Sequence, residues 1–132
     1  MKIFNNGDMG RDFTFVDDIV AGILACIDTP PKAGDEGTQA GAPHRVLNLG
    51  NNKPERLLDL VHILEELTGH KANTELLPMQ PGDVKETYAD IDLTRRVIGY
   101  EPTTSLHEGL EKFVAWYIDY YGLDNTQNSR AS

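Results

Sequence analysis

The sequence predicts a small mixed α/β module of about four helices and several short strands. Apolar residues recur at helical spacing in four stretches, and shorter apolar stretches bounded by glycine, proline or asparagine lie between them. The predicted order is strand, strand, helix, strand, helix, strand, helix, helix, with no internal repeat. This order favours a small mixed module over a complete doubly wound sheet.

The four predicted helices cover residues 17–28, 55–68, 92–98 and 106–121. Asp17 and Asp18 stand at the start of the first, where we expect carboxylates to cap free N–H groups and to favour the helix dipole. Gly69 ends the second helix. The last helix follows Ser105, whose spacing to Glu108 is that of a capping box.

The predicted strands are short, and irregular segments separate them. Residues 45–50, "RVLNLG", are predicted to form a buried strand, in which Asn48 is expected to hold neighbouring backbone. Residues 75–77 form a second strand that ends at Pro78. Residues 31–44 and 78–90 lack apolar periodicity and are predicted to be loops.

Length and composition limit the classes of protein. The 132 residues suit one domain, placed at residues 1–122, and a polar tail over residues 123–132 that we expect to be disordered. A formal charge of −9 disfavours nucleic acid and membrane surfaces as partners. No apolar run approaches the roughly 20 residues that cross a bilayer. The single cysteine, Cys26, cannot form an internal disulfide, which suits a reducing compartment, and we expect the cytoplasm.

The first candidate for a binding residue is Arg11, in "GDMGRDFTFVDD". The two glycines begin like a dinucleotide fingerprint, but Phe13 occupies the place of its third small residue. Arg11 follows the glycine turn at the mouth of a predicted strand in which Phe13 and Phe15 share one face. Two interpretations stay open: a surface arginine on a hairpin, or a guanidinium that makes a bidentate contact with phosphate or carboxylate.

The second candidate is the stretch Gln80-Pro81-Gly82-Asp83. Proline and glycine predict a tight turn, and the flanking amide and carboxylate suit hydrogen bonds to vicinal hydroxyl groups. The same composition is also typical of a plain β-turn.

Several kinds of catalytic motif are absent from the sequence. No Tyr is followed four residues later by Lys, there is no phosphate-binding P-loop, and no Ser lies in a nucleophile elbow. No pair of His or Cys has convincing metal-ligand spacing. We therefore expect no catalytic residue, no bound metal and no self-contained catalysis.

Three stretches carry a resemblance to a known family: "RDFTFVDDIVAGI", "RVLNLGNNKPERLLDLVHILEELTG" and "LPMQPGDVKETYADIDLTRRVIGYEPTTSLHEGLEKFVAWY". They resemble the C-terminal part of NAD-dependent nucleotide-sugar epimerases and dehydratases, the extended short-chain dehydrogenase group. The UDP-glucuronate 4-epimerases, often encoded with capsular polysaccharide genes, are most similar. The resemblance covers nearly the whole chain, residues 2 to 122.

The resemblance implies that this chain is the substrate-binding lobe, without the Rossmann lobe. Arg11 matches the arginine that contacts the UDP diphosphate, and Asp83 the acidic residue that binds the ribose hydroxyls. Gln80 stands where related UDP-galactose epimerases often carry a second phosphate-binding arginine. NAD and the Tyr/Lys pair belong to the N-terminal Rossmann region of the full-length enzyme, so that region and a UDP-sugar are the implied partners. The chain alone is expected to hold no cofactor and to catalyse nothing.

Two alternatives stay open beside this hypothesis. The chain is a free-standing UDP-sugar-binding or protein-interaction module, which an exposed stripe of Trp116 and Tyr120 would favour. Or it belongs to a dehydratase or decarboxylase of the same family, because this region alone does not set the reaction outcome. A homo-oligomer is compatible with each.

Overall fold

The computed structural model describes residues 1–39 and 41–123. They fall into two compact units, each built from separate stretches of the chain. Unit 1 comprises Met1–Gly10, Glu55–Lys85 and the stretch from Ser105 onward; unit 2 comprises Arg11–Pro54 and Glu86–Thr104. The predicted tail lies, from residue 124 onward, outside the described residues, and the one-domain boundary stays a prediction.

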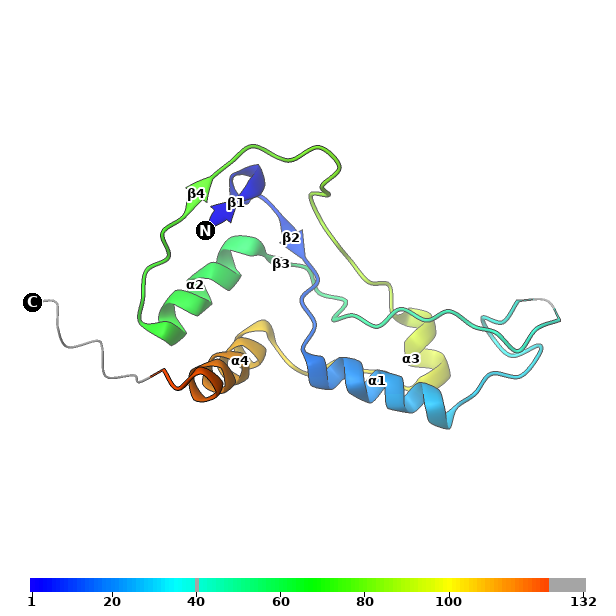
Figure 1. The fold of residues 1–132 in the computed structure, drawn as a ribbon. Helices are drawn as coiled ribbons and strands as arrows, with labels where there is room; N and C mark the ends of the chain where they lie inside the picture. Colours follow the sequence, from blue (N-terminus) through cyan, green and yellow to red (C-terminus); the bar gives the residue numbers. More distant parts are fainter. Residues whose placement is uncertain (40, 124–132) are drawn as a thin grey trace, which may run out of the picture. The chain divides into compact units, whose positions relative to one another are not determined.

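Unit 1 combines two helices with very short strands (Figure 1). Its strand β1 (Lys2–Ile3) pairs in parallel with β4 (Glu75–Leu76), and α2 (Leu57–Thr68) packs on α4 (Leu106–Tyr121). A 3-10 turn, η1 (Phe4–Gly7), follows β1, and β2 (Gly10–Arg11) pairs with β3 (Glu55–Arg56). The most deeply buried apolar side chains of this unit are Ile3, Met9, Val61 and Val114.

The ends of the unit 1 helices confirm two sequence predictions. Gly69 ends α2 in the left-handed conformation, at φ 70°, and its N–H bonds to the carbonyl of Glu65. The capping box of α4 is complete: Ser105 Oγ accepts from the Glu108 N–H, and the Glu108 carboxylate accepts from the Ser105 N–H at 3.0 Å. The Ser105 hydroxyl also donates to Glu108 Oε2 at 2.7 Å, and this bond, followed by the one from the Ser105 N–H, lowers the pKa of Glu108. Local sequence signals therefore fix these ends.

Unit 2 is built around two helices, α1 (Val16–Asp28) and α3 (Asp92–Ile98), which contact each other. Its centre contains Ile91 and Thr94, at 0% and 1% relative exposure, together with Tyr100. Gly22 of α1 permits close packing, because a Cβ there would lie 2.6 Å from Leu49 Cδ2 and 2.9 Å from Tyr100 Cδ2. The helix therefore packs against the segment around Leu49 through its smallest residue.

The predicted buried strand at residues 45–50 is wrong. Among the described residues, Arg45 forms only an isolated bridge with Thr38, and residues 46–50 join no ladder. Val46 is 70% exposed. Side chains take the place of a neighbouring strand: Thr94 Oγ1 donates to the Asn48 carbonyl at 2.8 Å, and Tyr100 OH to the Gly50 carbonyl at 3.0 Å. An apolar stretch needs a strand beside it before it becomes part of a sheet.

The predictions around the first helix also need correction. The glycine turn before Arg11, formed by Gly7 and Gly10, does not connect a hairpin, because β1 and β2 pair with different strands. The strand β2 ends at Arg11, so the predicted strand through Phe13 and Phe15 is wrong. Phe15, at the N-cap of α1, makes no side-chain cap hydrogen bond, and the Asp18 carboxylate accepts from Thr103 and Thr104 instead.

No helix among the described residues is long and apolar enough to span a membrane.

Candidate functional site

The candidate arginine lies in unit 2. Arg11 is the last residue of β2 and is half-buried. The N–H of the next residue, Asp12, donates to Thr87 Oγ1 at 3.0 Å. The main chain on the C-terminal side of Arg11 is thus held by a residue far along the sequence.

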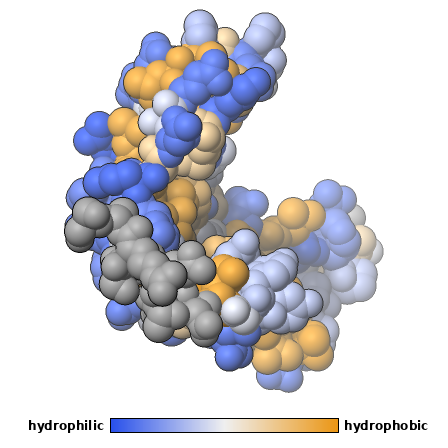
Figure 2. All heavy atoms as spheres, turned by 60° about the vertical axis from the view of Figure 1, so that its left-hand side comes forward, coloured by the Kyte–Doolittle hydropathy of each residue, from blue (hydrophilic) through white to orange (hydrophobic). Residues whose placement is uncertain are grey.

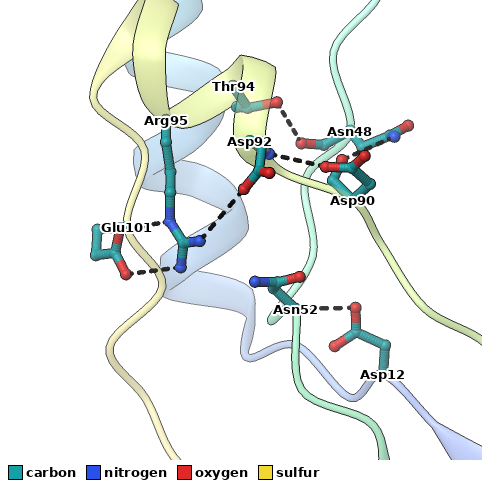
Figure 3. Close-up of polar contacts among 8 residues, drawn as sticks. All are labelled: Asp12, Asn48, Asn52, Asp90, Asp92, Thr94, Arg95 and Glu101. Carbon is teal, nitrogen blue, oxygen red and sulfur yellow. Dashed lines mark hydrogen bonds and ion pairs between the residues drawn. The ribbon is translucent and has the colours of Figure 1, made fainter.

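The side chain of Asp12 also fixes the main chain next to Arg11. Its carboxylate accepts backbone N–H groups from Asn51 at 3.1 Å, Asn52 at 3.1 Å, Lys53 at 3.4 Å and Ala89 at 2.9 Å. Figure 3 shows the carboxylate facing Asn52. An ionised carboxylate offers about four lone-pair positions. We call this arrangement the Asp12 clasp: Asp12 with the N–H groups of residues 51–53 and 89.

Glycine at position 50 gives the clasp its space. A Cβ on Gly50 would lie 2.3 Å from Ala89 Cβ and 3.0 Å from Asp12 Oδ2. The Gly50 carbonyl accepts the hydrogen bond from Tyr100 OH, whose ring is only 4% exposed. Burial, together with the charges of Asp18 and Asp12, raises the pKa of Tyr100. The phenol therefore stays protonated and donates.

Polar contacts of α3 support the same region (Figure 3). Asn48 Nδ2 donates to the Asp90 carbonyl at 3.0 Å, which confirms that Asn48 holds backbone. Arg95 pairs with Glu101 through two hydrogen bonds, Nε at 2.7 Å and Nη2 at 2.9 Å, and this pairing lowers the pKa of Glu101. Asn52 has a backbone φ of 56°. When its amide is turned so that the nitrogen faces acceptors and the oxygen faces donors, the nitrogen donates to the Ala89 carbonyl and the oxygen accepts from Arg95 Nη1.

Gln80 and Asp83 are brought together in unit 1 by a tight turn. The Asp83 N–H bonds to the Gln80 carbonyl at 3.2 Å, and Gly82 has φ +85°, as a turn of this composition requires. Asp83 Oδ1 accepts from the Val84 N–H at 2.9 Å, and Gln80 is exposed. The turn itself confirms the local prediction, while the binding roles of both side chains stay predictions. Arg11 belongs to the other unit.

Sequence reasoning did not find the clasp. The N–H groups that bind Asp12 lie 39 to 77 residues further along the chain, beyond the reach of any local motif. The one local signal is the stretch Gly50-Asn51-Asn52, whose residue types suit unusual backbone angles. Among the described residues, no group of three His, Cys, Asp or Glu side chains could hold a metal ion.

Comparison with known proteins gives the chain its family. No family model matches it. It is 41% identical over 128 residues to Protein CapI of Staphylococcus aureus, covering 92% of this chain and 38% of that protein. It is 46% identical over 129 residues to UDP-glucuronate 4-epimerase 4 of Arabidopsis thaliana, covering 96% of this chain and 30% of that one.

A solved structure agrees with these relatives. The UDP-glucuronic acid 4-epimerase of Bacillus cereus, in complex with UDP-glucuronic acid and NAD, is 32% identical and aligns with a TM-score of 0.72 over 91% of this chain and 35% of that one. The chain is a region of the NAD-dependent nucleotide-sugar epimerase family. The chain has the predicted mixed α/β class, with four helices and short strands, and spans about a third of the length of the proteins that it matches.

Proposed function

We propose that this region is the nucleotide-sugar-binding part of an NAD-dependent UDP-sugar 4-epimerase, and that UDP-glucuronate is its substrate. The similarity to UDP-glucuronate 4-epimerases supports the substrate class. The single observation that carries the proposal is the fixed position of Arg11 beside the Asp12 clasp. A role in capsule or cell-surface polysaccharide synthesis, in the cytoplasm, is part of the same proposal.

Each of the three candidate side chains suits a different part of a nucleotide. The Arg11 guanidinium suits two parallel hydrogen bonds to diphosphate oxygens, which are stronger than bonds between neutral groups. The Asp83 carboxylate can accept hydrogen bonds from two ribose hydroxyls. The Gln80 amide both donates and accepts, so it suits a neutral polar contact. The role proposed for each is binding, with no part in bond breaking.

NAD is assigned to another part of the epimerase. A dinucleotide pyrophosphate sits at a helix N-terminus behind a glycine-rich turn. Gly7 ends the 3-10 turn η1, Gly10 begins a strand, and Gly34, Gly37 and Gly41 lie in turns, so none of these glycines opens a helix. When bound, NAD supplies the hydride chemistry of such an enzyme. By itself this region is expected to catalyse no epimerisation.

The surface of α1 supports a partner that contains the cofactor site. Five of its large apolar residues are 46% to 68% exposed: Val16, Val20, Ile23, Leu24 and Ile27. Figure 2 shows hydrophobic residues, in orange, at the surface beside hydrophilic ones. A stripe of this kind favours burial against another surface. We assign it to the NAD-binding Rossmann part, since the relatives are about three times as long as this region.

The test uses this chain grafted into the Bacillus cereus epimerase in place of the region that it matches. Arg11→Ala should weaken UDP binding by about 1.5–3 kcal/mol, as the loss of a charge-assisted hydrogen bond does. Calorimetry with UDP measures the affinity. Arg96→Ala is the control, because Arg96 also lies in unit 2 and pairs with Glu36 at 2.9 Å. Equal UDP affinity for Arg11→Ala and the unaltered graft would contradict the proposal.

A protein-interaction module is the second candidate, favoured by the aromatic face of α4. Trp116 and Tyr120 are 53% and 67% exposed and stack with ring centroids 5.2 Å apart. The graft separates the candidates, because an interaction module would not restore turnover of UDP-glucuronic acid. The product that the graft forms from UDP-glucuronic acid also distinguishes a 4-epimerase from a dehydratase or decarboxylase.

A further inference from the structure

We infer that Asp12 is a positioning residue, which fixes Arg11 for anion binding through the clasp. The inference rests on the proposed function of Arg11, and it adds a residue that does not touch the ligand. Its basis is the convergence of four backbone N–H groups on one carboxylate that directly follows the candidate arginine.

The two carboxylate oxygens share the donors evenly. Oδ1 accepts from Asn51 at 3.1 Å and Lys53 at 3.4 Å, and Oδ2 accepts from Asn52 at 3.1 Å and Ala89 at 2.9 Å. Hydrogen bonds to an ionised acceptor are stronger than those between neutral groups. The negative charge of Asp12 is thus stabilised by backbone dipoles from two separate segments. Its side chain is thereby committed to holding structure.

No other residue type can make this arrangement. Asparagine has one acceptor oxygen, and its NH₂ group would face two N–H donors. Glutamate carries one more methylene, which would move its carboxylate away from the positions where Asp12 Oδ1 and Oδ2 accept these four N–H groups. The main chain of Asp12 is held as well, by the bond of its N–H to Thr87 Oγ1. The main-chain nitrogen and the side-chain carboxylate of Asp12 are therefore both held by hydrogen bonds.

A fixed backbone lowers the cost of binding. A long side chain that is immobilised by a ligand loses rotamer entropy, and a main chain that is already ordered adds nothing to that loss. Without the clasp, the ligand would have to order residues 11 and 12 as well as the guanidinium. Loss of Asp12 should therefore weaken binding only where Arg11 is present to use its position.

The experiment is a double-mutant cycle on the 132-residue chain, with UDP as the probe. The variants are Asp12→Asn, Arg11→Ala and the double variant. Amide chemical shifts during titration at millimolar UDP give the affinity, and hydrogen exchange reports the clasp. We expect Asp12→Asn to speed exchange at Asn51, Asn52, Lys53 and Ala89 and to weaken UDP binding about 3- to 10-fold. In the Arg11→Ala background it should cause no further loss.

Four results would overturn a claim, and they distinguish the proposed function from the inference. If Arg11→Ala leaves UDP binding unchanged, or the unaltered chain shows no UDP shifts, the proposed function fails. If Arg11 matters but Asp12→Asn binds UDP normally, the inference fails. An equal loss from Asp12→Asn in both backgrounds also overturns it, because that result indicates a merely structural role. Should Asp12→Asn not fold, Thr87→Val removes the acceptor of the Asp12 N–H while keeping the side-chain shape, and the same cycle applies.

Discussion

Gly50 is the glycine of unit 2 at which an added Cβ would meet its nearest neighbour most closely. Gly50→Ala would place a methyl group 2.3 Å from Ala89 Cβ, so we expect overpacking to destabilise the chain by about 1–3 kcal/mol. Denaturant unfolding measures the change. Ala89→Gly in the same chain removes the methyl group that the new one would meet, and it should restore part of the loss. A Gly50→Ala chain of full stability would contradict the close approach.

Asp18 makes stability depend on pH. Burial raises the pKa of this carboxyl, but hydrogen bonds from Thr103 and Thr104 outweigh burial and hold the pKa below the ordinary value of 3.8. Since the folded pKa is the lower one, the stabilisation is complete above the unfolded pKa and is lost as the pH falls through the folded pKa. We expect Asp18→Asn to lose stability at pH 7 and to show a flatter decline on acidification. Urea unfolding between pH 7 and pH 2 checks this, with the exposed Asp17→Asn as the control.

At the scale of elements, α1 is a helix whose apolar stripe is largely exposed. Changing Ile23 and Ile27, which are 49% and 68% exposed, to lysine should barely alter the unfolding of this chain, because exposed substitutions usually change stability by less than about 0.5 kcal/mol. In the Bacillus cereus graft the same pair should lower NAD retention, since the stripe would face the cofactor-binding part. Asp28→Lys, on the same helix, is the charge control. If the graft with both lysine substitutions retains NAD normally, the apolar stripe of α1 does not face the cofactor-binding part.

The helices were predictable from sequence because their signals are local. Each observed helix begins within two residues of its predicted start, and Gly69 and Ser105 set ends as their residue types require. The failure of the predicted strand at residues 45–50 was not predictable, because an apolar pattern indicates only which side chains prefer burial. Whether such a segment pairs depends on which strand lies beside it. Here Thr94 and Tyr100 bond to its carbonyls instead.

At the scale of the whole molecule, the candidate site was only partly predictable. Arg11 and the turn at residues 80–83 have local signals, and the turn was found where predicted. The Asp12 clasp joins segments far apart in sequence, and its donors are main-chain groups that every residue except proline possesses. Side-chain motifs can therefore indicate which residue touches a ligand, but not what keeps that residue in place.

The interleaving of the two units has a consequence for synthesis on the ribosome. Each unit is interrupted by at least one stretch of the other, so no contiguous fragment contains one unit alone. Asp12 leaves the ribosome long before Ala89, which follows 77 residues later, and the loop between them must close before this hydrogen bond forms. The nascent chain thus carries this acidic side chain without the last of its amide donors until residue 89 has emerged. Unit 2 is likewise incomplete until its second stretch, Glu86–Thr104, has been made.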